Sequence, residues 1–176
     1  MVAELMALSA RTAPKARGTD SIVIKIISGD DLKKLAGEMR RLGELLNFKP
    51  LLRDSGNMDQ SDACVLIGSR AERIVGLNCG GCGYATCDEL LAAQKARGKE
   101  TSGMKTPYGG PNCAIRMADL GIALGSAAKT ASIHNVDNRI MLTAGVGALS
   151  LGWMEDCKVA YGIPLKASGK SIYFDR

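Results

Sequence analysis

Four of the six cysteines have a spacing typical of ligands to a metal or an iron–sulfur cluster. Three follow the pattern C-x2-C-x4-C and the fourth lies further along the chain; they are Cys79, Cys82, Cys87 and Cys113. Glycines between the first three allow the backbone to fold tightly and to present its N–H groups to a bound group. Thiolates select iron–sulfur clusters or zinc. The spacing therefore predicts a thiolate site between residues 79 and 113.

The supply of ligands favours a four-iron cluster over a single zinc ion. A cubane has four irons that each need one ligand, so three close cysteines and a distant one suit it. A single zinc ion is usually held by two separated C-x2-C pairs, and only one such pair is present. We therefore expect a [4Fe–4S] cluster. A zinc-stabilised structural or interaction module remains an alternative, as do disulfides or free thiols.

Two of the cysteines fall where helices are expected to begin. Cys87 precedes a predicted helix over 88–97, and Cys113 lies at the start of one that runs from about 111 to 131. The free N–H groups and partial positive charge of helix N-termini stabilise an anionic centre. Full ligation by cysteine favours electron transfer or a structural role over Lewis-acid catalysis. We expect electron transfer to a redox partner protein.

The other cysteines and the single histidine carry weaker signals. Cys64 lies in an apolar run, which indicates a core residue. Cys157 is interpreted as a strand residue at the edge of the core, although a role as redox partner or alternative ligand stays open. His134 has no partner in evidence and is interpreted as a residue that connects helices. Three aspartates are interpreted as helix caps or surface acids: Asp119, Asp137 and Asp175.

A basic segment follows the first predicted helix, which spans residues 3–10. Its cations are Arg11, Lys15 and Arg17, and Pro14 and Gly18 interrupt it. One interpretation is a solvated loop. The other is an anion site for a phosphate-bearing cofactor.

The remaining pattern predicts an α/β fold. Apolar runs at 22–27 and 63–68 read as buried strands, and the stripe of Leu32, Leu35, Met39, Leu42 and Leu46 predicts a helix after Gly29. Further expectations are a polar connection over 49–62 with room for a short helical turn, a loop at 98–110, a helix over 138–151, a strand at 156–161, a turn at 162–164 and a strand at 171–174. Gly121 and Gly125 are expected to admit a neighbouring backbone. We expect a single domain, 1–176, in which a sheet of about four strands has helices on both faces and 76–116 is an inserted cluster-binding segment.

Composition excludes several classes of protein. A net charge of +5, scattered along the chain, is too small to indicate a nucleic-acid partner. The longest apolar region, 114–131, contains Arg116, Asp119 and Lys129, so we expect no membrane span. No signal peptide is apparent, and six cysteines in such a chain indicate metal or redox use in the cytoplasm.

The cysteine segment resembles the four-cysteine cluster domain of RnfB-type electron-transport proteins and of corrinoid iron–sulfur proteins. Those share a C-x2-C-G-x3-C run and a distant cysteine, matched here by Cys79, Cys82, Gly83, Cys87 and Cys113. The gap before Cys113 is longer than in those domains. Over nearly its whole length the chain also resembles the prokaryotic family of uncharacterised proteins containing a ferredoxin domain. The segments that carry this resemblance are 10–15, 77–83, 162–165 and 174–176.

A looser resemblance is to the flavin-dependent nitroreductases. It rests on Ala10-Arg11-Thr12-Ala13-Pro14 after an early helix, and on Ser150-Leu151-Gly152 with Gly162-Ile163-Pro164 near the end. The resemblance implies a nitroreductase-like sandwich in which Arg11, Lys15 and Arg17 meet the phosphate of FMN. The alternative function that follows is an oxidoreductase in which the cluster feeds a flavin.

Overall fold

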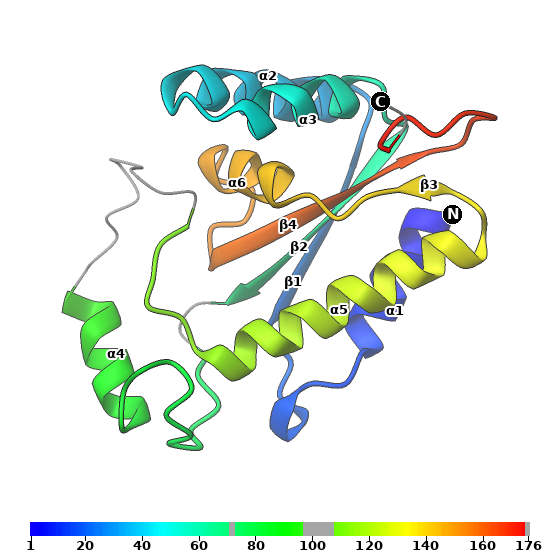
Figure 1. Ribbon diagram of the computed structural model, residues 1–176. Helices are drawn as coiled ribbons and strands as arrows, with labels where there is room; N and C mark the ends of the chain where they lie inside the picture. Colours follow the sequence, from blue (N-terminus) through cyan, green and yellow to red (C-terminus); the bar gives the residue numbers. More distant parts are fainter. Residues whose placement is uncertain (71–72, 97–107, 175–176) are drawn as a thin grey trace.

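A four-stranded antiparallel sheet forms the centre of the computed structural model, which describes residues 1–70, 73–96 and 108–174 (Figure 1). The strands lie in the order β1-β2-β4-β3. Their bounds are β1 Ile22–Ser28, β2 Ala63–Arg70, β3 Asp137–Asn138 and β4 Cys157–Lys166. β2 is buried over all its interior positions, whereas β1 is an edge strand on which Ile26 is 39% exposed. Both early strands were expected to be fully buried. This expectation is confirmed for β2 and is wrong for β1.

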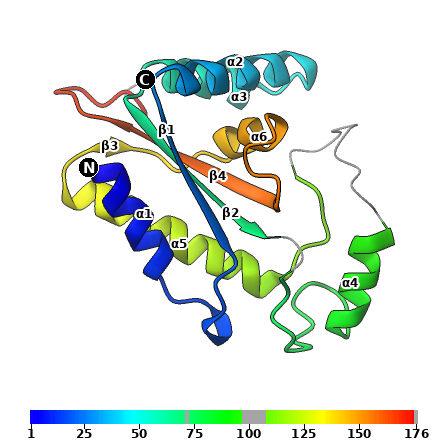
Figure 2. The same ribbon diagram turned by 180° about the vertical axis from the view of Figure 1, so that it is seen from behind.

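Helices cover both faces of the sheet. One face carries α1 (Val2–Thr12) and α5 (Ala114–Ile133), and the other carries α2 (Asp30–Leu45), α3 (Lys49–Asp59) and α6 (Leu142–Ser150). Both views show α6 between the sheet and the α2–α3 pair (Figures 1 and 2). The turn η1 (Ala16–Gly18) and helix α4 (Cys87–Ala96) complete the described elements. The predicted α/β sandwich with helices on both faces is confirmed.

Alternation along β2 divides the core into two apolar clusters. Cys64 and Leu66 point to the cluster under α2 and α6, and Val65 and Ile67 point to the cluster under α1 and α5. Successive side chains of a strand face opposite sides of a sheet, so one strand serves both layers. No helix in the described part of the chain is long and apolar enough to cross a membrane.

Helix α6 lies unusually close to β4, and glycine makes this possible. A Cβ on Gly145 would lie 1.7 Å from the carbonyl oxygen of Ala160, and one on Gly162 would lie 2.6 Å from Cβ of Ala144. The expected turn at 162–164 is therefore wrong, because these residues lie inside β4. Gly162 therefore permits close contact between a helix and the sheet, and it does not form a chain reversal.

Close approach was also expected at Gly121 and Gly125 of α5, and this expectation is wrong. A Cβ on either residue would meet no atom within 4 Å. Small residues four apart on a helix permit a contact, but they do not require one. The contact that the fold uses lies on α6.

Three other boundaries differ from expectation. The polar stretch from residue 49 forms α3, with Pro50 in its first turn and Leu51 and Met58 buried on one side. The predicted helix over 138–151 begins only at Leu142, since Asn138 belongs to the short strand β3. Residues 171–174 form bends instead of a strand. Most of the predicted loop at 98–110 lies outside the described residues, and so does Asp175.

Candidate metal centre

The three closely spaced cysteines lie on an excursion from the sandwich, residues 73–96, which follows β2 (Figures 1 and 2). Cys79 is exposed in its loop, Cys82 is half-buried, and the half-buried Cys87 is the first residue of α4. Cys113 is buried and is the N-cap residue of α5. The excursion therefore carries three candidate ligands, and the sandwich carries the fourth.

Glycine shapes the loop that holds the first two cysteines. Gly80 and Gly83 have φ values of 69° and 87°, in the region that side chains with a Cβ rarely adopt. The N–H of Gly83 donates to the carbonyl of Gly80 at 2.9 Å, which closes a tight turn around Cys82. The expectation that these glycines let the chain fold tightly is confirmed.

Asn78 ties this loop to Cys87. Its backbone N–H donates to Sγ of Cys87 at 3.3 Å, and its side-chain Oδ1 accepts the backbone N–H of Cys87 at 2.8 Å. Asn78 has φ 48°, a left-handed conformation that asparagine tolerates better than most residues. The pair of bonds holds Cys79, the next residue, beside the start of α4.

Helix α4 begins with a capping box that our sequence reasoning missed. The carboxylate of Glu89 accepts the N–H groups of Ala85 at 3.0 Å and Thr86 at 3.4 Å, and the N–H of Glu89 donates to the hydroxyl of Thr86 at 3.3 Å. The spacing Thr86-x-x-Glu89 is the sequence signature of this motif. It fixes Cys87 at the start of the helix, as expected, although the helix includes Cys87 and was predicted to begin at residue 88.

The loop packs against the first turn of α5. A Cβ on Gly81 would lie 3.3 Å from Cβ of Ala114 and 3.7 Å from Sγ of Cys79. Beneath this contact, Val75, Leu90 and Cys113 form a small buried cluster against which Cys82 packs. Both cysteine segments therefore meet at the N-termini of α4 and α5.

The described side chains do not form a ready-made site for a single metal ion. Within residues 1–70, 73–96 and 108–174, no three His, Cys, Asp or Glu side chains are placed where they could hold a single ion. A cubane takes one thiolate per iron, so its four ligands need not converge on one point. Two helix N-termini and a glycine-rich loop supply N–H groups and positive charge for an anionic cluster. The donor set fits such a cluster.

A buried ion pair anchors α5 beside this centre. Arg116 and Asp119 are each 3% exposed, and their Nη1 and Oδ2 atoms lie 2.8 Å apart. Arg116 also donates to the carbonyl of Arg73 at 2.8 Å, and Asp119 accepts the N–H of Ala16 at 2.9 Å. The interpretation of Asp119 as a cap or surface acid is wrong.

Asp137 is half-buried and accepts the N–H of Ile172 at 2.7 Å.

Two cations of the basic segment serve the fold. The Nζ of Lys15 donates to the carbonyls of Ala10 at 2.9 Å and Ala13 at 2.8 Å, and also to that of Arg11, which satisfies the end of α1. Burial lowers the pKa of Lys15, although Asp20 opposes the shift. Arg11 is bonded to Asp20 and to the carbonyl of Ile22 at 2.7 Å. The guanidinium of Arg11 and the ammonium of Lys15 are thus both bonded to other atoms of the protein.

Arg17 differs from the other two because it lines a cavity of about 420 Å³. The cavity is also lined by Thr19, Ile74, Val75 and two further arginines, Arg73 and Arg116. Arg17 has φ 56° and donates to the carbonyl of Val75 at 3.4 Å. The structure therefore groups Arg17 with Arg73 and Arg116 instead of Arg11 and Lys15. Sequence spacing could not have indicated this set, since tertiary contacts bring it together.

The two remaining cysteines lie in the core, as expected. Cys64 is 0% exposed in β2 and Cys157 is 7% exposed at the start of β4. Burial raises the pKa of the Cys64 thiol. Burial, with Asp156 nearby, raises the pKa of Cys157 to about 12. Both thiols are therefore protonated at neutral pH, which disfavours metal binding. His134 is exposed at the end of α5 and connects it to β3.

Two family models match the chain. Residues 76–102 match a model described as "Putative Fe-S cluster", and residues 109–176 match one described as "Uncharacterized protein containing a ferredoxin domain". The chain is also 44% identical, over 176 residues and 90% of the relative, to an uncharacterized protein of Archaeoglobus fulgidus. These matches support iron–sulfur binding by the cysteine segment. They also confirm the family resemblance predicted from the sequence.

Solved structures with a similar fold include several nitroreductases. The FMN-dependent nitroreductase NfnB from Mycobacterium smegmatis, in complex with NADPH, has a TM-score of 0.58 at 10% identity and covers 96% of this chain and 78% of its own. The nitroreductase from Saccharomyces cerevisiae has a TM-score of 0.57 at 11% identity, covering 98% and 83%. CinD from Lactococcus lactis, in complex with nicotinic acid, has 0.56 at 13%, covering 99% and 83%. The likeness confirms the expected nitroreductase-like fold.

Proposed function

Because the chain belongs to the family of uncharacterised proteins containing a ferredoxin domain, we propose that it binds a [4Fe–4S] cluster and transfers electrons to a redox partner protein. The ligands are Cys79, Cys82, Cys87 and Cys113. The observation that carries the proposal is the contact of Gly81 with Ala114, which joins the cysteine loop to the N-terminus of α5. When bound, the cluster supplies one-electron redox chemistry.

Exposure at the loop supports electron transfer over a purely structural role. Cys79 is exposed, and the side chain of Leu77 beside it is 53% exposed. A cluster held at this edge would lie near the surface, where a partner protein could dock transiently. The N–H of Gly83 already donates to the carbonyl of Gly80. Those of Gly80 and Gly81 remain as donors to sulfur, and such bonds would raise the reduction potential.

Metal analysis of protein purified without oxygen tests the proposal. We expect close to four irons and four sulfides per chain, a brown colour that dithionite bleaches, and an EPR signal after reduction. Protein that contains one zinc and no iron would instead support the zinc-stabilised module. Serine at each of the four proposed ligands should lower the iron content.

Alanine at the buried cysteines provides the matched controls. Cys64→Ala and Cys157→Ala should retain iron, because both side chains belong to the apolar cluster under α2 and α6. If Cys157→Ala loses iron while Cys113→Ser retains it, the assignment of the fourth ligand is wrong.

A second candidate function is a flavin-dependent oxidoreductase in which the cluster feeds FMN. Two observations favour it: the nitroreductase-like fold and the cavity lined by Arg17, Arg73 and Arg116. Guanidinium groups pair with phosphate in a bidentate manner, so this cavity is the better place for a flavin phosphate than the side chains of Arg11 and Lys15.

Titration of FMN into the iron-loaded protein tests this second function. Quenching of flavin fluorescence should saturate. Arg17→Gln and Arg73→Gln should each lower the affinity for FMN about tenfold, because one charged contact to the phosphate is lost. Arg40→Gln is the control, because Arg40 pairs with Asp59 on the opposite layer. Equal binding by all three variants would remove the arginine cavity from the flavin hypothesis.

A further inference from the structure

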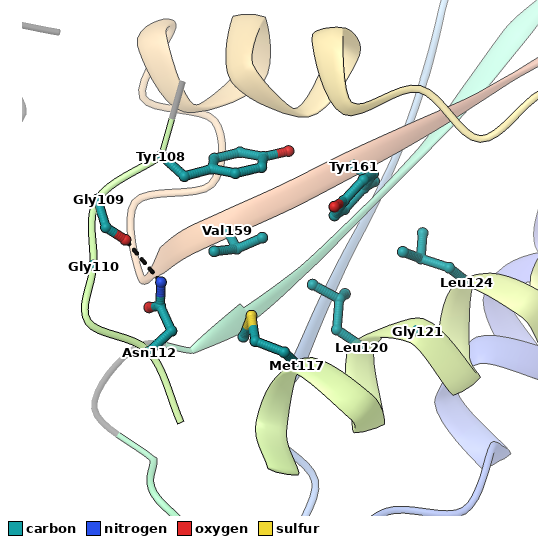
Figure 3. A pocket seen from close by; sticks show the side chains of 10 residues that line it. All are labelled: Tyr108, Gly109, Gly110, Asn112, Met117, Leu120, Gly121, Leu124, Val159 and Tyr161. Carbon is teal, nitrogen blue, oxygen red and sulfur yellow. Dashed lines mark hydrogen bonds between the residues drawn. The ribbon is translucent and has the colours of Figure 1, made fainter. Parts of the chain in front are cut away.

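A second cavity, of about 400 Å³, lies between α5, β4 and residues 108–112 (Figure 3). Its volume is in the range of small-molecule sites in proteins. Its position is next to the candidate metal centre, because Asn112 at its edge directly precedes Cys113. The family models and the proposed cluster leave this cavity without a role.

The walls of the cavity are uncharged and mostly apolar. Among the described residues, ten line the cavity, and none of them has an ionisable acidic or basic group other than the two tyrosine hydroxyls. The apolar lining consists of Met117, Leu120 and Leu124 from α5 and Val159 from β4 (Figure 3). An ionic ligand would lose its hydration here without gaining a counter-charge, which is unfavourable. The lining therefore selects an uncharged ligand.

Two tyrosines give the cavity an aromatic wall. The rings of Tyr108 and Tyr161 have centroids 5.9 Å apart and are tilted by 51°. The hydroxyl of Tyr108 donates to the carbonyl of Ala160, and the carbonyl of Leu142 accepts from the same hydroxyl at 3.3 Å. These contacts hold the ring of Tyr108 in place. Burial raises the pKa of Tyr108, which keeps this hydroxyl protonated. Rings and the Met117 thioether favour a flat aromatic ligand.

Two polar atoms at the cavity are available to such a ligand. Asn112 uses its Nδ2 to donate to the carbonyl of Gly109 at 2.8 Å, and no described residue donates to its Oδ1. The hydroxyl of Tyr161 likewise has no hydrogen-bond partner among residues 1–70, 73–96 and 108–174. One acceptor and one donor thus accompany the apolar walls.

From these observations we propose that the cavity binds a small, flat, uncharged aromatic molecule that carries a hydroxyl or carbonyl group. The ring lies against Tyr161, Met117 and Leu120. The polar group of the ligand reaches the Tyr161 hydroxyl and Oδ1 of Asn112. A molecule bound here lies close to Asn112, the residue before Cys113. The proposal concerns binding alone and does not depend on the cluster.

Glycine in the wall provides a sharp test. Gly121 lines the cavity, and a Cβ there would meet nothing within 4 Å, so a side chain can enter the cavity without disturbing the fold. Gly125, one turn further along α5, is equally free of contacts but does not line the cavity. Gly121→Leu and Gly125→Leu therefore form a matched pair.

The probe is 2-naphthol, an uncharged bicyclic phenol, titrated into the full iron-loaded chain and followed by its own fluorescence. We expect saturable binding to the wild type and to Gly125→Leu. Gly121→Leu should bind at least about tenfold more weakly, because leucine occupies the ring site. Tyr161→Phe should bind about fivefold more weakly, through loss of one hydrogen bond.

The anion 2-naphthoate has the same rings and provides the control for charge. It should bind at least about tenfold more weakly than 2-naphthol. Melting temperatures of both leucine variants should equal or exceed that of the wild type, since glycine is unfavourable in a helix. No binding of 2-naphthol, equal binding by the two leucine variants, or equal binding of the anion would each overturn the proposal.

Discussion

Asn78 has more influence on the candidate metal centre than a residue outside the ligand set usually has. Both of its bonds go to Cys87, and its own position places Cys79 beside that residue. A hydrogen bond to sulfur also changes the electron density of a ligand and so its behaviour toward iron. Asparagine was not identified by sequence reasoning, because a single polar residue in a loop has no spacing that reports its partner.

Replacing Asn78 by alanine should therefore weaken iron retention. We expect Asn78→Ala to release iron to a chelator roughly ten times faster, as a second-layer partner of metal ligands is removed. Asn47→Ala is the matched control, because Asn47 has the same φ of 48° and lies in an exposed turn between α2 and α3, outside the cysteine segment. Equal release rates would show that the loop holds its shape without the Asn78 bonds.

Cys157 gives a prediction about pH. The ordinary pKa of cysteine is about 8.5, and burial raises that of Cys157 to about 12. Between these values the unfolded chain loses this proton and the folded chain keeps it, so stability falls as pH rises through the window. At pH 9.5 the loss should be about 1.4 kcal/mol relative to neutral pH.

Urea unfolding at pH 7.5 and 9.5 measures this effect. The drop in unfolding free energy should be smaller by about 1.4 kcal/mol in Cys157→Ala than in the wild type. An unchanged drop would mean that Cys157 ionises in the folded protein, which would reopen a role for its thiolate.

Residue types predicted some roles and not others for a physical reason. The cysteine spacing and the helix starts at Cys87 and Cys113 are local features, so the sequence contained them. Lys15 and Asp119 were expected to face solvent or a ligand, yet both are directed to chain atoms brought close by folding. The role of a charged residue depends on its burial, and burial is set by distant elements.

At the level of elements, α5 and α6 make opposite use of glycine. Each helix contains small residues at short intervals, but Gly145 on α6 lies against the backbone of β4, while Gly125 on α5 faces open space. The sequence pattern is similar in both cases. Only the packing of α6 between the sheet and the α2–α3 pair distinguishes them (Figure 1).

Alanine at these two glycines should therefore have opposite effects on stability. Gly125→Ala should raise the unfolding free energy by about 1 kcal/mol, through helix propensity alone. Gly145→Ala should lower it by at least about 3 kcal/mol, because its Cβ would overlap a carbonyl oxygen that cannot move without shifting β4. Chemical denaturation of both variants checks the signs; destabilisation by Gly125→Ala would contradict the open space seen on α5.

The elements were predictable where periodicity was long and missed where context overrode it. The stripe of α2 and the apolar run of β2 were recognised directly. Pro50 and Gly56 made α3 look like a connection, although proline is acceptable in the first turn of a helix. Gly162 and Pro164 indicated a turn, but a neighbouring helix required glycine within a strand.

The whole molecule consists of a sandwich with two apolar clusters and an excursion with a small cluster of its own. The clusters of the sandwich contain none of the four proposed ligands, and only Cys113 is fixed to one of its helices. The sandwich should therefore fold without iron, whereas the order of the excursion should depend on it.

Hydrogen exchange with and without a chelator tests this division. Iron removal should increase exchange within 73–96 and the first turn of α5, and leave β2 and β4 unchanged. Far-UV circular dichroism should retain most of its intensity. Increased exchange throughout the sheet would show that the cluster supports the entire fold.

The placement of three ligands on the excursion and one on the sandwich also has a topological consequence. A cluster bound by Cys79 and Cys113 would act as a cross-link that closes the chain between them into a ring, and closing a long segment reduces the entropy of the unlinked state. Destruction of the cluster by oxygen would open that ring. The described part of the excursion, residues 73–96, should then be cut more readily by proteases.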